Sequence, residues 1–126
     1  ESSFPKVLRA VKTSGGRIGL AINPDTPLDA MLPFVPKVER VLVMTVRPGF
    51  SGQKYIYEME GKIKELRKLF PDLDIEVDGG LNLETVRHAY KNGANLLAAA
   101  SAIFAHDDKR SAIADLRKRA LSDVFP

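Results

Sequence analysis

Cysteine and long apolar runs are both missing from this 126-residue sequence, and each absence excludes a class of protein. Without cysteine there is no disulfide framework and no thiolate metal site, which fits a cytoplasmic protein. No run reaches the roughly 18 apolar residues that a membrane-spanning helix needs, so we expect no membrane segment. The first residues lack both the pattern of a secretory signal and an initiator methionine, which indicates a processed, trimmed or engineered form.

The sequence also lacks a large excess of charge of one sign, because its formal net charge is only +3. Part of it is concentrated near the carboxyl terminus, in Arg110, Arg117, Lys118 and Arg119. Aromatic residues that could stack on bases do not interleave with this run, so we interpret it as a solvated helix face and exclude nucleic acid as the main partner. The mild excess of positive charge suits an anionic small substrate.

Hydrophobic residues make up 44% of the sequence and charged residues 28%, a balance typical of one soluble globular domain with a real core. The apolar patterns predict strands over residues 18–22, 41–46, 74–78 and 96–100. The first two runs lack polar alternation, which is typical of strands buried on both faces.

Helical patterns lie around and between these strands. The spacing of apolar residues and the end signals predict helices over about 4–14, 56–70, 83–91 and 109–121, and a short one from Leu28 to about Leu32 or Phe34. Because strand and helix alternate, the strands must run parallel and be joined by right-handed crossovers. The sequence therefore predicts an α/β fold with a parallel sheet.

Asp78 ends the third predicted strand and is followed by Gly79 and Gly80, just before a helix. A carboxylate at a strand end and bare backbone N–H groups at a helix start suggest an acid/base or metal-binding group beside a phosphate. The alternative is an ordinary Asp-Gly-Gly turn. Asn23, the loop of residues 49–52 and Ser101 also follow strands. Since the carboxyl ends of parallel strands share one edge, where α/β folds bind ligands, we favour a site.

Several neighbouring residues allow two interpretations. The glycines could cradle a phosphate through their backbone or simply form tight turns, and we favour the cradle. Ser101 could donate to the same phosphate or cap a turn, and Met44 could point to a ligand, although the pattern favours the core. The glycines concerned are Gly49, Gly52, Gly79 and Gly80.

The two histidines offer little chemistry. His88 lies in the middle of a predicted helix and is expected to be exposed. His106 is next to Asp107 and Asp108, but the spacing resembles no set of metal ligands. Asp78 is then the one carboxylate at a strand tip, and a single carboxylate cannot hold a divalent metal. The residues alone leave the site unfinished.

These segments closely resemble the ribulose-phosphate 3-epimerase family of (β/α)8-barrel enzymes. The resemblance is carried by residues 20–24, 43–54, 76–80 and 101–104, of which the second is highly specific. It implies that residues 1–126 form the carboxyl-terminal half of a ribulose-phosphate-binding TIM barrel, from just after the fourth strand through the eighth strand and its helix.

The resemblance also implies a reaction in the pentose phosphate pathway, the inversion of D-ribulose 5-phosphate at C3 to give D-xylulose 5-phosphate. Two aspartates move the proton on opposite faces, and a divalent metal (Zn, Fe, Mn or Co) stabilises the enediolate. Asp78 matches one of these aspartates and a metal ligand, and Met44 matches a methionine that shields the enediolate. The matched phosphate contacts are Gly49, Phe50, Ser51, Gly52, Gly79, Gly80, Ala100 and Ser101.

The chain departs from the family pattern in three ways. Ser51 and Ala100 replace glycines and add a Cβ near the phosphate. The other metal ligands and the opposite-face aspartate have no counterpart, so they are expected in a missing amino-terminal half. We therefore expect the chain alone to be inactive, and its open sheet to be covered in a homo-oligomer or by a second chain. The alternatives are another sugar-phosphate epimerase, such as one acting on allulose 6-phosphate, a related synthase, or an inactive phosphate-binding or scaffold fragment.

Overall fold

In the computed structural model of the chain, which describes residues 3–50 and 52–123, the strands form one parallel sheet. Within these residues the strand order is β1-β2-β3-β4, so β1 and β4 are the two edges, as the resemblance predicts. The predicted parallel α/β architecture is confirmed. The strand bounds are Gly19–Ile22 for β1, Arg40–Met44 for β2, Asp74–Asp78 for β3 and Leu96–Ala98 for β4.

The helices agree with the predicted alternation but differ in detail. Their bounds are Phe4–Thr13 for α1, Glu60–Leu69 for α2, Thr85–Lys91 for α3, Ser101–Phe104 for α4 and Lys109–Leu121 for α5. The short helix predicted from Leu28 is instead a pair of 3-10 turns, η1 (Leu28–Ala30) and η2 (Val35–Lys37), and another 3-10 turn, η3 (Tyr57–Met59), precedes α2. Prolines in this region prevent a longer helix. The sequence did not indicate α4. No helix in the described ranges has the length and apolar character needed to cross a membrane.

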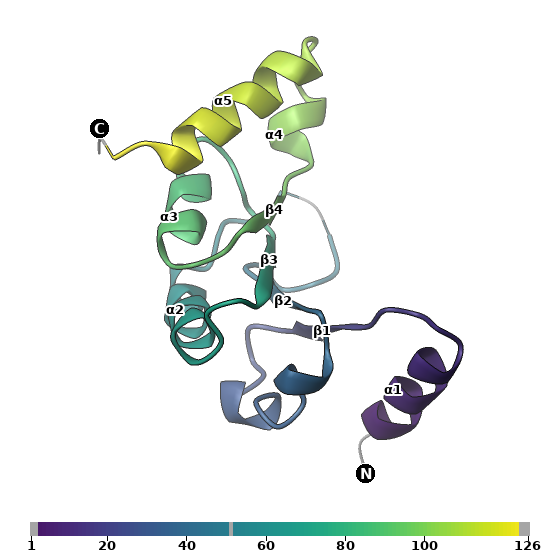
Figure 1. Ribbon diagram of the computed structural model, residues 1–126. Helices are drawn as coiled ribbons and strands as arrows, with labels where there is room; N and C mark the ends of the chain where they lie inside the picture. The colour runs from purple at the N-terminus through teal and green to yellow at the C-terminus, as the bar shows by residue number, and fades with distance from the viewer. Residues whose placement is uncertain (1–2, 51, 124–126) are drawn as a thin grey trace.

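The helices cover one face of the sheet. In Figure 1, α2 and α3 lie on the same side of the strands, α5 packs on α3, and α1 stands apart from the rest. The ring of Phe4 on α1 contacts that of Phe34 edge to face, with 4.8 Å between centroids. Because side chains alternate along a strand, only one face of each strand meets the helices.

The covered face holds the core. Val41, Val43, Ile75 and Val77 are fully buried and belong to one cluster with α2 and α3. The residues between them face the other way: Leu42 and Met44 are half-buried. On β1, Ala21 is exposed. The first two strands are therefore buried on one face only, as expected for an open half-barrel, because no described element covers the second face.

Charged side chains also lie on the open face. Arg40 on β2 donates to Glu76 on β3 with an Nη1–Oε2 distance of 2.9 Å. In the strand register Leu42 is opposite Glu76, and Met44 is opposite Asp78. The open face therefore combines an ion pair near its middle with an apolar side chain and a carboxylate near its carboxyl edge.

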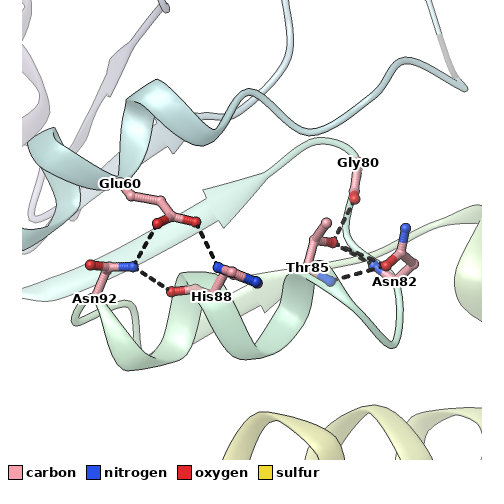
Figure 2. Close-up of polar contacts among 6 residues, drawn as sticks. All are labelled: Glu60, Gly80, Asn82, Thr85, His88 and Asn92. Atoms are coloured by element: carbon pink, nitrogen blue, oxygen red, sulfur yellow. Dashed lines mark hydrogen bonds and ion pairs between the residues drawn. The ribbon is translucent and has the colours of Figure 1, made fainter. Parts of the chain in front are cut away.

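His88 links α3 to α2, contrary to the expectation that it would be exposed. Its side chain is half-buried, with Nδ1 3.2 Å from Glu60 Oε1, and its ring lies edge-on to that of Tyr57. Asn92 donates to the other oxygen of Glu60 at 3.0 Å. Figure 2 shows Glu60 on α2 in contact with His88 of α3 and with Asn92, the residue directly after this helix. Glu60, the contact partner that partly shields His88 from solvent, lies 28 positions away in the sequence, so local periodicity could not reveal this contact.

Arg67 fixes the start of β3 relative to α2 and β4. Its guanidinium donates to the carbonyls of Gly93, Pro71 and Leu73 at 2.7–2.9 Å. It also donates to the side chain of Asn95, whose oxygen accepts from the amide of Ile75 at 2.8 Å. One side chain thus satisfies backbone acceptors from two connecting segments, the one between α2 and β3 and the one between α3 and β4.

We expect Arg67→Ala to lower the free energy of unfolding by about 2–3 kcal/mol, because it leaves several partly buried carbonyls without a donor. The neighbouring exposed residue offers a matched control. Lys68→Ala should change the free energy of unfolding by less than about 0.5 kcal/mol. Urea denaturation followed by circular dichroism measures both. Equal values for the two variants would contradict the role given to Arg67.

Candidate active site

Asp78 lies at the carboxyl edge of the sheet with its side chain exposed to solvent. As the last residue of β3 it pairs with Met44 of β2 and Ala98 of β4. Its carboxylate forms no hydrogen bond or ion pair with any residue in the described part of the chain. It is therefore available to a ligand at this edge, where the sequence predicted a site.

Met44 ends β2 on the open face, opposite Asp78 in the strand register. The pattern of apolar residues favoured a place in the core, but the side chain is half-buried and belongs to the uncovered face. The family resemblance matches Met44 to a methionine that faces the ligand. Its role as a shield for a reaction intermediate stays a prediction.

Gly79 and Gly80 form a turn that packs tightly against the loop after β2. Both have positive φ angles, 122° and 67°. A Cβ at Gly79 would lie 2.5 Å from Val46 Cγ2, and one at Gly80 would lie 2.5 Å from the backbone nitrogen of Tyr55. No larger residue fits at either position without a shift of the backbone. The close packing alone accounts for the glycines, and it leaves a phosphate cradle as a prediction.

The carbonyls of this turn are held by two buried threonines that the sequence analysis did not single out. The amide of Thr45 donates to Asp78 O at 2.9 Å, and its hydroxyl donates to Gly79 O at 2.6 Å. The hydroxyl of Thr85 donates to Gly80 O at 2.7 Å, as Figure 2 shows. Little in the sequence singled out either residue, because the predicted strand over 41–46 includes Thr45 and the predicted helix over 83–91 includes Thr85.

The loop after β2 also lies at this edge. Gly49 and Gly52 have φ angles of 148° and 83°, and a Cβ would meet open space at both. Phe50 is 75% exposed, and Ser51 lies outside the described residues. Arg47 forms an ion pair with Asp25, from the loop after β1. These two loops are thus joined on the same side of the sheet.

Ala100 and Ser101 follow β4 and are both exposed. Ala100 is the residue before α4, and Ser101 begins this helix, so the serine does not occupy the capping position. The alternative that Ser101 only caps a turn therefore loses support. Asn23 is exposed at the end of β1, and its carbonyl accepts from the amide of Thr26.

Tyr55 belongs to the hydrophobic core and packs its backbone against Gly80 in the turn after β3. Burial, and then the negative charge of Glu60, raise the pKa of its phenol above the ordinary value. The phenol therefore stays protonated at neutral pH, and it is 6% exposed. Because its backbone abuts Gly80, this buried residue limits how closely the loop after β2 approaches the turn after β3.

A metal site is not complete within the chain. In residues 3–50 and 52–123, no three or more His, Cys, Asp or Glu side chains come together in a way that could hold a metal ion. Asp78 could contribute one ligand, and a catalytic metal site needs about three from the protein. The described residues therefore do not fit a metal by themselves.

Comparison with known proteins places this geometry in a family. The model of the ribulose-phosphate 3 epimerase family matches residues 1–104. The chain is similar to ribulose-phosphate 3-epimerases of Eremothecium gossypii (42% identity, 94% of this chain and 53% of the relative) and Methanocaldococcus jannaschii (47%, with the same two shares). It is also similar to a rice protein named as the cytoplasmic isoform, at 44% identity over 92% of this chain and 52% of the relative.

A solved structure has the same fold. It is 3-hexulose-6-phosphate synthase from Salmonella typhimurium, with a TM-score of 0.67 and 20% identity over 94% of this chain and 56% of that one. The chain therefore spans about half the length of the curated relatives it matches, and a comparable share of this barrel enzyme. The four-stranded parallel sheet within the described residues is part of a barrel, and the chain belongs to the ribulose-phosphate 3-epimerase family.

Proposed function

We propose that this chain forms the carboxyl-terminal half of a ribulose-phosphate 3-epimerase that interconverts D-ribulose 5-phosphate and D-xylulose 5-phosphate. The observation that carries the proposal is the Asp78 carboxylate at the carboxyl edge, which has no partner among the described residues and lies next to the Gly79–Gly80 turn, in a chain of this family. Residues 1–126 would then be one half of a single barrel domain. The rice relative's name supports a cytoplasmic location.

Asp78 would move the proton on one face of the substrate. Inversion at C3 begins when a base takes the C3 proton, and the electron pair of the C–H bond moves toward the C2 carbonyl to give an enediolate. A proton then returns to C3 from the opposite face, and the electron pair moves back. A solvent-exposed carboxylate at the strand tip suits the first or the last of these transfers. The second acid/base group must come from residues beyond those described.

The phosphate of the substrate would bind at the turns beside Asp78. Backbone N–H groups of glycine-rich turns bind phosphate, and barrels of this type commonly bind it after their last two strands. In this chain those turns are Gly79–Gly80 and Ala100–Ser101. The loop with Gly49, Phe50, Ser51 and Gly52 would close over the ligand, and Met44 would cover the reacting carbons. Exposed glycines with positive φ make such a loop adaptable.

A divalent metal would supply positive charge near the enediolate oxygens when bound. Asp78 is the one ligand that we assign to it. The remaining ligands would lie outside the described residues, and the identity of the metal is left open among Zn, Fe, Mn and Co.

The open face of the sheet would be covered by the remaining strand–helix units of the barrel. Two edge strands and a face with half-buried Leu42 and Met44 support this, as does the fact that the chain accounts for 53% of the length of two curated relatives. Uncovered edges and apolar surface of this kind promote association. A second copy of the chain is the other possible occupant.

We predict that Asp78→Asn lowers kcat by about a thousandfold in the chain joined to the complementary half of the Methanocaldococcus jannaschii relative, since an amide cannot accept the C3 proton. The matched control is Asp74→Asn, at the opposite end of the same strand. Asp74 accepts from Asn95, and Asp74→Asn keeps an oxygen for that bond. Coupled turnover of D-ribulose 5-phosphate measures both. Similar kcat values for the two variants would contradict the role of Asp78.

The 126-residue chain alone is expected to release no tritium from C3-labelled D-ribulose 5-phosphate above the rate of a chelated control. The physical reason is that it supplies one acid/base group where inversion needs two, and too few metal ligands. Scintillation counting of the released water measures the exchange. Exchange above the control would show that the chain carries a complete site.

Light scattering should give a mass above the 13.9 kDa of one chain, because the open face associates. Leu42→Glu, on that face, should shift the mass toward the monomer. Leu69→Glu, at an exposed position on α2 that is away from the face, should leave it unchanged. A monodisperse monomer of the unmodified chain would contradict the expectation that this face associates when the rest of the barrel is absent.

A further inference from the structure

We infer that Thr45 and Thr85 are positioning residues of the proposed phosphate site. Their hydroxyls hold the carbonyls of Gly79 and Gly80, so that the N–H groups of this turn are directed toward the anion. The inference rests on the proposed function, because it assigns the parts of the same site that set its geometry. The two residues are nearly the whole of the buried polar set: Thr45 is 0% and Thr85 is 4% exposed, and Arg87 is the other such residue among those described.

Thr45 is fixed at each of its polar groups. Its amide donates to Asp78 O at 2.9 Å and its hydroxyl to Gly79 O at 2.6 Å. Its carbonyl accepts from the amide of Ile56 at 2.8 Å. The residue thus connects the end of β2, the turn after β3 and the segment leading to α2. The hydroxyl has one proton, and the shorter distance assigns that proton to Gly79 rather than to Asp78, which is 3.1 Å away.

Thr85 holds the next carbonyl from the other side. It is the first residue of α3, and its hydroxyl donates to Gly80 O at 2.7 Å while it accepts from the amide of Asn82 at 3.0 Å. The side chain of Asn82 in turn accepts from the amide of Thr85 at 3.0 Å. Figure 2 shows this set of bonds at the start of α3. The hydroxyl therefore has a defined direction, which a solvent-facing serine or threonine lacks.

The geometry of the peptide bond turns these contacts into a constraint on the N–H groups. In a planar trans peptide the carbonyl of one residue and the N–H of the next point in opposite directions. With the carbonyls of Asp78, Gly79 and Gly80 held by threonines, the N–H groups of Gly79, Gly80 and Leu81 point away from them. The N–H groups of Gly80 and Leu81 donate to no residue in ranges 3–50 and 52–123, whereas that of Gly79 lies where β3 pairs with β4. Consecutive amides left unpaired in this way form an anion-binding surface.

A merely structural role would affect stability and leave the affinity for phosphate unchanged. Without its hydroxyl donor, each carbonyl could rotate and its peptide plane would turn the following N–H away from the ligand. The two roles therefore separate when stability, carbonyl geometry and phosphate binding are all measured on the same variants.

The test uses Thr45→Val and Thr85→Val, with Thr45→Ser and Thr85→Ser as variants that keep the hydroxyl. Ile63→Val, in the fully buried part of α2, is the control for a general loss of stability. The probes are inorganic phosphate and D-ribulose 5-phosphate. Nuclear magnetic resonance follows the carbonyl carbons of Gly79 and Gly80 without ligand, and the amides of Gly79, Gly80 and Leu81 during titration.

We expect both valine variants to shift these carbonyl signals and to weaken binding of both probes roughly fivefold to tenfold, the effect of about one hydrogen bond. The serine variants should restore most of the affinity, and Ile63→Val should leave it unchanged. Carbonyl signals or affinities that stay at wild-type values in both valine variants would overturn the inference and leave the phosphate site intact. If the amide signals of the unmodified chain do not shift with either probe, the proposed phosphate site is contradicted, and the inference with it.

Discussion

Burial of a single face of the parallel sheet is the constraint on which the rest of the structure depends. Val41, Val43, Ile75 and Val77 form the covered face, and Ile63 and Leu66 of α2 complete the packing. Since parallel strands need a crossover after each strand, the carboxyl ends of all described strands lie at the same edge. The proposed site residues are brought together there, and the opposite face of the sheet is left open by the described residues.

The turn after β3 combines tight packing of its glycines with N–H groups that are directed toward a proposed ligand. Gly79 and Gly80 are needed for packing, because a Cβ would collide with Val46 and with the backbone of Tyr55. The same close approach brings Thr45 within reach of the turn, where its hydroxyl holds a carbonyl. Tight packing and directed N–H groups therefore come from one arrangement. A glycine that the packing demands can also serve a ligand.

In the proposed reaction, inversion of a carbon centre demands groups on both sides of the substrate, and the described residues would supply one side. Asp78 is exposed and unpartnered by the described residues, which suits a proton transfer but leaves the opposite side empty. The open sheet face, the two edge strands and the half-length match to the relatives fit the same description. The chemistry and the architecture thus point to a site that is shared with residues outside those described.

Local periodicity was enough to predict the alternation of strands and helices, the bounds of α5 and the position of Asp78 at a strand tip, because these depend on residues within one or two turns of each other. The sequence also contained the segments that carry the family resemblance. Tertiary structure decided which face of each strand is buried, where Met44 lies, why His88 is half-buried, and that Thr45 and Thr85 hold the glycine turn. Apart from the contact between Thr85 and Gly80, which are five residues apart, each of these depends on a partner far away in the chain, and no periodic pattern encodes the register that brings such partners together.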